Sequence, residues 1–237
     1  MSAKALSNSV LHRLVEEGNF KEIRGEQGPF KAIINPKTSN PLGEARVFKG
    51  YGSEKLVYIG MNVESQLDSH MIFAFNDEFS PVPHFTLDVV ELSDFCAYHL
   101  DLLPRVDLGV NLQYAQKVYL PLNTTYQEGK NLEGVSPAHL APIQLAFMSP
   151  WMLANRATKE ALPSLTPIIE RYLDHWLTLR KDRLELDKCV DIPAQELSSR
   201  DKKHRSFLFS HAVDPVWAQV ERIVGRQESE QLRSLLL

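Results

Sequence analysis

The sequence predicts an α/β protein, a three-layer α/β/α sandwich around a central antiparallel sheet. Three features indicate this fold class: an amphipathic N-terminal segment, short strand-like runs between about residues 30 and 103, and a second half in which helical spacing prevails. With 237 residues, 43% of them apolar, the chain can bury a sizeable core. We therefore expect a single domain over residues 1–237.

The first element is predicted to be a helix over residues 5–17. Leu6, Val10, Leu11 and Leu14 recur at helical spacing, and charged residues lie on the opposite side. After this segment the period of the apolar residues changes. The spacing therefore predicts one amphipathic helix ahead of the sheet.

The sheet is predicted from runs rich in β-branched and aromatic residues, separated by turn signals such as Asn35-Pro36 and Ser80-Pro81. Connections this short favour antiparallel pairing. The run from Met71 to Phe75 is apolar on both faces, so other elements must cover both sides of the sheet. The clearest strands are residues 45–49, 55–63, 70–76, 84–91 and 95–103.

Helices in the second half are expected to provide this cover. Four of them open with a polar residue followed by proline, the pattern of an N-cap before the first helical residue: Ser136, Ser149, Thr166 and Asp214. The expected helices are residues 112–119, 137–148, 150–158, 167–179 and 215–224. Residues 184–205 are expected to form an exposed loop.

Composition and missing motifs narrow the class of function. A net charge of −4 argues against a general nucleic-acid binder, and no apolar run approaches the roughly 20 residues of a membrane span. Cys96 and Cys189 form no C-x-x-C pair, so we expect both to be reduced and buried, without a disulfide or thiolate metal site. Dinucleotide, P-loop, zinc-protease and serine-hydrolase signatures are missing. Nicotinamide, nucleotide, zinc and serine-hydrolase chemistry therefore lose support.

A polar set of side chains stands out within the apolar strands. Strand alternation places His84, Thr86 and Asp88 on one face, and the next strand likewise contributes His99 and Asp101. Polar side chains on a covered face imply either a satisfied buried network or a pocket. Each residue taken alone fits a structural role, and both interpretations stay open.

Asp214 has a structural explanation as well, since it precedes Pro215 and an apolar stripe that ends before Gly225. An aspartate at this place caps the helix. The helix N-terminus would then stabilise the charged carboxylate and lower the pKa of Asp214.

The segments 83–90, 99–108 and 114–119 resemble red chlorophyll catabolite reductase, a member of the ferredoxin-dependent bilin reductase superfamily. The Leu-Leu-Pro-Arg-x-Asp-Leu motif at residues 102–108 is the most specific part of this resemblance. Looser matches are Ser149-Pro150, the helix with Trp176, and Asp214 eleven positions before Gly225. The resemblance covers about residues 55–225.

The resemblance implies an α/β/α sandwich that holds a linear tetrapyrrole between the sheet and the C-terminal helices. It also implies an enzyme that reduces red chlorophyll catabolite or a bilin such as biliverdin. Electrons would come one at a time from an external [2Fe-2S] ferredoxin, and protons from acidic or histidine side chains. No flavin or metal takes part, because the substrate itself carries the radical.

The resemblance also assigns roles to individual residues. Asp88 takes the place of the acidic proton donor on the central strand, and Asp214 that of a second acid, which either donates a proton or binds a pyrrole nitrogen. His70 lies where phycocyanobilin-forming reductases have a histidine, so it is a third catalytic candidate. The chain mixes features of two branches, which leaves the substrate open. The expected substrate contacts are His84, Thr86, His99 and Arg105.

The basic run at residues 200–205 is expected to dock ferredoxin through Lys202, Lys203 and Arg205, since an acidic partner needs a local positive patch. Its simpler explanation is a solvated loop. A non-catalytic bilin-binding or chaperone-like protein with the same fold is the alternative function, and an unrelated sandwich with a structural polar network is a third. We expect a bacterial cytoplasmic protein, or a plastid stromal one whose transit segment has been removed.

Overall fold

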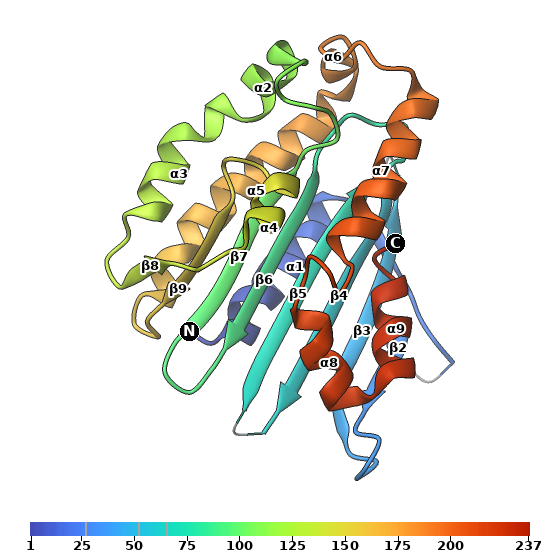
Figure 1. The fold of residues 1–237 in the computed structure, drawn as a ribbon, viewed down its shortest axis with the longest axis vertical. Coiled ribbons are helices and arrows are strands. Elements are labelled where there is room, and N and C mark those ends of the chain that lie inside the picture. The colour runs from blue at the N-terminus through green and yellow to red at the C-terminus, as the bar shows by residue number, and fades with distance from the viewer. Residues whose placement is uncertain (27, 52, 65) are drawn as a thin grey trace.

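The computed structural model describes residues 1–26, 28–51, 53–64 and 66–237. Its centre is an antiparallel sheet in the order β1-β3-β4-β5-β6-β7-β9-β8, with β2 paired to β3. Helices lie on both sides, so the predicted α/β/α sandwich is confirmed (Figure 1). The described strands are β1 (Phe20–Ile23), β2 (Lys31–Ile34), β3 (Pro41–Gly50), β4 (Ser53–Val63), β5 (Leu67–Asn76), β6 (His84–Glu91), β7 (Cys96–Leu103), β8 (Val135–Pro137) and β9 (Leu153–Ala157).

Two groups of helices form the outer layers. Behind the sheet in Figure 1 lie α1 (Ala3–Glu17) and α5 (Thr166–Lys181), beside α2 (Leu112–Val118) and α3 (Asn123–Lys130). In front lie α4 (Pro142–Phe147), α7 (Ala194–Leu208), α8 (Val216–Val224) and α9 (Arg226–Ser234). The short α6 (Arg183–Asp187) joins α5 to the front layer, and two 3-10 turns span Leu120–Leu122 and Leu162–Leu165.

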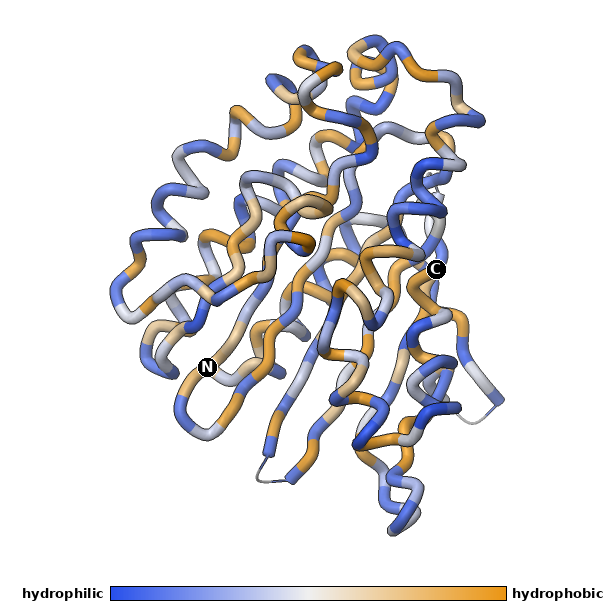
Figure 2. Tube along the Cα trace, in the orientation of Figure 1, coloured by the Kyte–Doolittle hydropathy of each residue, from blue (hydrophilic) through white to orange (hydrophobic). Residues whose placement is uncertain are grey.

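The core is divided by the sheet, because successive side chains of a strand point to opposite faces. In β5, Ile72 and Ala74 join the core under α1 and α5, whereas Met71, Phe73 and Phe75 join the core under α7, α8 and α9. Hydrophobic residues therefore follow the central strands, while the outer turns are mainly hydrophilic (Figure 2). This explains why β5 is apolar on both faces.

The first helix, the five clearest strands and the helices near residues 112, 167 and 215 are confirmed, apart from small shifts of their ends. The prediction of helices over 137–148 and 150–158 was wrong. Val135–Pro137 and Leu153–Ala157 are strands, and only Pro142–Phe147 is helical. In Leu153–Ala157 every second residue is buried, the period of a strand with one covered face, and this strand lies between β7 and β8 in the sheet.

The expected exposed loop over 184–205 was also wrong. Most of it is α6 and α7, and α7 buries Leu197, Asp201 and Leu208 on one side against the sheet. Both cysteines are free thiols; Cys96 is buried as expected, but Cys189 is partly exposed. Within the described part of the chain, no helix is both long and apolar enough to cross a bilayer.

Candidate functional site

A small cavity lies between the sheet and the front layer, beside Asp88. Thr86 and Asp88 of β6 and His99 of β7 face it, because the strand register places Asp88 opposite His99. Asp214, just before α8, closes the other side. The cavity has a volume of about 150 Å³, and its apolar walls include Phe73, Leu103, Met148, Leu208, Phe209 and Val213. The structure thus brings together four of the residues singled out in the sequence.

Asp88 and His99 form a pair at the bottom of this cavity. The distance from His99 Nδ1 to Asp88 Oδ2 is 3.6 Å. Burial by itself lowers the pKa of His99, but the nearby Asp88 carboxylate, helped by the charges of Asp101 and Asp214, raises it above its ordinary value. Asp88 Oδ1 and His99 Nε2 are buried and have no hydrogen-bond partner among the described residues. Burying a polar atom without a hydrogen-bond partner costs free energy, and a ligand that supplies the partner would remove this cost.

The carboxyl group of Asp214 is largely buried, and this environment raises its pKa. Burial raises the pKa of Asp214 to about 6, and the nearby Asp88 charge adds to this increase. The backbone N–H of Val216, which donates to Asp214 Oδ1 at 3.1 Å, lowers the pKa but does not cancel the effect of burial. The expected lowering by a helix cap was therefore wrong. Helix α8 begins at Val216, and a single N–H reaches the carboxyl group, which does not offset its loss of water.

Asp101 lies behind the cavity and holds the chain segment that forms one of its walls. It is fully buried, and Ser149 donates to it twice, from its backbone N–H at 2.9 Å and from Oγ at 2.5 Å. Burial raises the pKa of Asp101 despite the His99 charge and these hydrogen bonds. Ser149 thereby fixes the neighbouring Met148 in the cavity wall. The sequence predicted Ser149 as a helix cap and as a loose family match, but not this contact with Asp101.

His84 and Arg105, the other expected substrate contacts, do not line this cavity. Both are buried and bind Asp201 of α7: the distances to Asp201 Oδ1 are 2.7 Å from His84 Nε2 and 3.2 Å from Arg105 Nε. Arg205 Nε lies 3.1 Å from Asp201 Oδ2. His84 Nδ1 accepts the backbone N–H of Asn76. These contacts attach α7 to the sheet.

The protonation states of this network follow from its burial. Burial lowers the pKa of His84 to about 3, although the Asp201 charge opposes this, so the imidazole is neutral. Burial alone would raise the pKa of Asp201, but His84, Arg105 and Arg205 together hold it well below its ordinary value. Asp201 was missed in the sequence. The helical spacing of Leu197, Asp201, Arg205 and Leu208 was the signal for its inward orientation.

His70 lies on the opposite face of the sheet, so it cannot act together with Asp88 in the cavity. Met71 is the residue of β5 that stands opposite Asp88, and a shift of one residue along a strand reverses the face. His70 instead hydrogen-bonds Tyr58 Oη at 2.8 Å and Asp68 Oδ1 at 3.0 Å. Burial lowers the pKa of His70 in spite of Asp68.

The side chains of the basic run at residues 200–205 point to different sides of α7, some to solvent and some into the protein. Lys202 is exposed and lies 2.7 Å from Glu78 Oε2, and Lys203 is exposed as well. Arg205 points inward and is only 3% exposed, so its expected part in docking is corrected. Elsewhere, no group of three or more histidine, cysteine or acidic residues within the described ranges is placed to hold a metal ion.

The chain belongs by its architecture to the class of three-layer α/β/α sandwiches. A solved structure of this class is phytochromobilin synthase from tomato in complex with biliverdin. The two structures match with a TM-score of 0.76 at 17% sequence identity, over 98% of this chain and 81% of the tomato chain. At this identity the likeness establishes the fold. No protein-family model and no curated protein matches the sequence.

Proposed function

We propose that this protein is a reductase of linear tetrapyrroles that uses ferredoxin as its electron donor. The observation that carries the proposal is the cavity in which Asp88, His99 and Asp214 meet under apolar walls. Two of its buried polar atoms lack partners among the described residues, so the cavity suits a mainly apolar ligand with a few polar N–H and C=O groups. A linear tetrapyrrole has this composition, and the tomato structure of the same fold contains biliverdin.

The reduction of one double bond requires two electrons and two protons. Ferredoxin would deliver the electrons singly, and the tetrapyrrole would carry the unpaired electron between the two transfers. Asp88 would donate a proton from the sheet side, with His99 as its ion-pair partner. Asp214 would act from the helix side, where a pKa of about 6 suits proton donation near neutral pH.

The substrate within this class is proposed to be red chlorophyll catabolite or a bilin. The motif at residues 102–108 favours the first, and the biliverdin in the tomato structure favours the second. Thr86 lines the cavity beside Asp88 and is the proposed contact on the sheet. Lys202 and Lys203, on the outer side of α7, are the proposed docking residues for an acidic ferredoxin.

The test is a visible spectrum of the purified protein with biliverdin and with red chlorophyll catabolite, before and after reduced ferredoxin is added without oxygen. We expect at least one of them to bind and to be converted into a product that absorbs at shorter wavelength. Binding without conversion, with a ferredoxin shown to be active, would indicate a bilin-binding protein without turnover. No binding of either compound would refute the proposal.

A further inference from the structure

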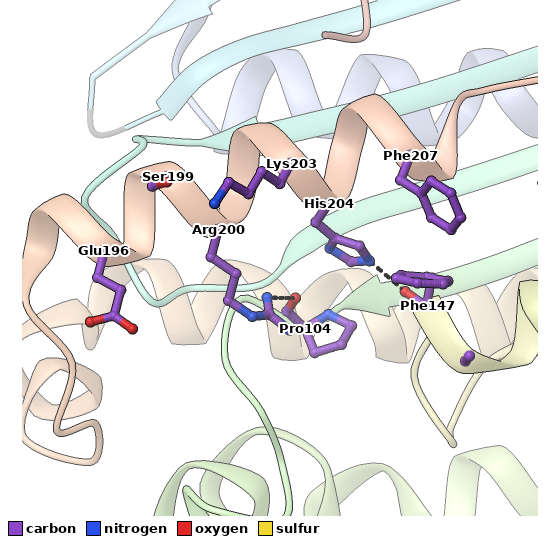
Figure 3. A pocket seen from close by; sticks show the side chains of 9 residues that line it. Pro104, Phe147, Glu196, Ser199, Arg200, Lys203, His204 and Phe207 are labelled. Carbon is purple, nitrogen blue, oxygen red and sulfur yellow. Dashed lines mark hydrogen bonds between the residues drawn. The ribbon is translucent and has the colours of Figure 1, made fainter.

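A separate pocket lies behind the sheet, on the side away from the catalytic cavity. The groove between α4 and α7 in Figure 3 belongs to the front layer, as the cavity does. The rear pocket is formed where α5 passes into α6, beside the end of α1 (Figure 1), and it has a volume of about 520 Å³. None of the roles proposed above makes use of it. The side chains that give the rear pocket its chemical character are Tyr51, Asn76, Arg180, Lys181 and Leu184.

Arg180 supplies a half-buried positive charge to this pocket. It extends from the last turn of α5, and its guanidinium carbon lies 4.9 Å from the centre of the Trp176 ring and 5.2 Å from that of Phe20. The guanidinium group donates to the carbonyl oxygens of Gly18 at 3.4 Å and Tyr51 at 3.2 Å. Burial lowers the pKa of Arg180, and no acidic neighbour among the described residues opposes this effect. The charge of Arg180 is therefore fixed in place by rings and carbonyl groups.

Lys181 adds a second positive charge at the open side of the pocket. Glu17 and Asp187 are the carboxylates that line the pocket, and each already pairs with an arginine other than Arg180, at 2.7 Å and 3.9 Å. In the part of the chain that the structure describes, neither Arg180 nor Lys181 has a carboxylate within ion-pair distance. The C-terminal carbonyl groups of α5 stabilise such cations only in part. An anion with about two negative charges would neutralise both.

Asn76 presents a hydrogen-bond acceptor without a partner. Its side chain is fully buried at the end of β5, and its amide nitrogen donates to the carbonyl oxygens of Pro83 at 2.7 Å and Val82 at 3.4 Å. Rotating the amide by half a turn would bring its oxygen against these two carbonyls, so the hydrogen bonds fix its orientation. Asn76 Oδ1 has no partner among the described residues. A ligand hydroxyl group would supply the missing donor.

The size and the opening of the pocket suit an organic ligand. A volume of about 520 Å³ lies within the roughly 300–1,000 Å³ of small-molecule sites, and inorganic phosphate is far smaller. Two large apolar side chains line the opening and remain exposed, Tyr51 at 93% and Leu184 at 75%. The exposed ring of Tyr51 offers a flat face on which an aromatic base can stack.

We propose that the rear pocket binds a phosphate monoester of the size of a nucleotide. Arg180 and Lys181 hold the phosphate group, which carries a charge of about −1.5 to −2 at pH 7 and which both arginine and lysine bind. Asn76 Oδ1 accepts a hydrogen bond from a sugar hydroxyl. The sheet separates this site from Asp88, because Asn76 shares the rear face of β5 with Ile72 and Ala74. The site is therefore independent of the proposed reduction.

The experiment measures binding to the full chain by isothermal titration calorimetry at low ionic strength. The ligands are adenosine 5′-monophosphate, ribose 5-phosphate, inorganic phosphate and adenosine, which separate the phosphate, the sugar and the base. The variants are Arg180→Lys, which keeps the charge but loses the planar fork, and Lys181→Gln, which changes an exposed side chain and should fold. Lys188→Gln is the matched control, because Lys188 is exposed near α6 and pairs with Glu185 at 2.6 Å. Circular dichroism verifies the fold of each variant.

We expect the wild type to bind both organic phosphates at least about tenfold more tightly than inorganic phosphate or adenosine. Each variant loses a charge-assisted contact, so Arg180→Lys should bind adenosine monophosphate at least about tenfold more weakly and Lys181→Gln at least about threefold. Lys188→Gln should resemble the wild type. The inference is overturned if the wild type binds no phosphate, if adenosine or inorganic phosphate binds as tightly as adenosine monophosphate, or if Lys181→Gln keeps the wild-type affinity.

Discussion

The free energy of unfolding should depend strongly on Asp201, the shared acceptor of the buried network on α7. Its side chain is fully buried and is held by His84, Arg105 and Arg205. Asp201→Ala leaves two guanidinium groups buried without this counter-charge, and breaking a buried pair in this way costs about 3–5 kcal/mol. Folded domains are stable by only about 5–15 kcal/mol. The variant should therefore lose a large fraction of its stability.

Asp174→Ala provides the control. Asp174 also pairs with an arginine, at 2.7 Å from Arg13, but its side chain is 60% exposed. Exposed pairs of this kind contribute about 0.2–1 kcal/mol, because water screens them. Asp201→Asn separates charge from shape, since its amide oxygen still accepts from His84; an intermediate loss is expected. Urea unfolding followed by circular dichroism gives the three free energies. A loss for Asp201→Ala no larger than for Asp174→Ala would refute the reasoning.

The same network links stability to pH through His84. Its pKa is about 3 in the folded protein and ordinarily 6.5, so the unfolded chain binds this proton more readily. The contribution of the neutral imidazole to the free energy of unfolding is therefore complete above about pH 6.5, and it is lost progressively as the pH falls towards 3. Urea midpoints measured from pH 7 to pH 4 should fall for the wild type. His84→Gln, which cannot titrate, should show a smaller fall over the same range, and an equal slope would count against this linkage.

Three further predictions concern the reaction. Asp88→Asn should bind tetrapyrrole with similar affinity but turn over at least about a hundredfold more slowly, or accumulate a radical, in single-turnover spectra; fast, clean turnover would exclude Asp88 as the donor. Because the pKa of Asp214 is about 6, turnover should decline as the pH rises through that value, and the decline should vanish in Asp214→Asn; a limb that persists would assign it to another group. Lys202→Ser with Lys203→Ser should raise the ferredoxin KM at low ionic strength, and Lys202→Ser alone should bind tetrapyrrole like the wild type; a wild-type salt dependence of the double variant would make this helix face irrelevant to docking.

Local periodicity in the sequence was sufficient to predict the layers and the face of β6 on which two of the cavity residues lie. Alternation along β6 placed Thr86 and Asp88 on one face, and the strand that follows brought His99 opposite Asp88. These features depend only on the geometry of one strand and on a short connection, so they can be predicted from one continuous stretch of sequence. The same holds for the helices that follow Thr166 and Pro215, whose apolar stripes face the sheet.

Contacts between distant segments were decided only by the tertiary structure. His70 was expected among the catalytic residues but lies on the other face from Asp88, because a displacement of one residue along β5 moves a side chain through the sheet. Asp201 had the pattern of a solvated basic run until the packing of α7 placed it against His84, 117 positions earlier. The pKa of Asp214 likewise depends on how much water the folded chain removes from its carboxyl group. Burial and pairing across the chain are properties of the whole fold, and no local pattern of residues contains them.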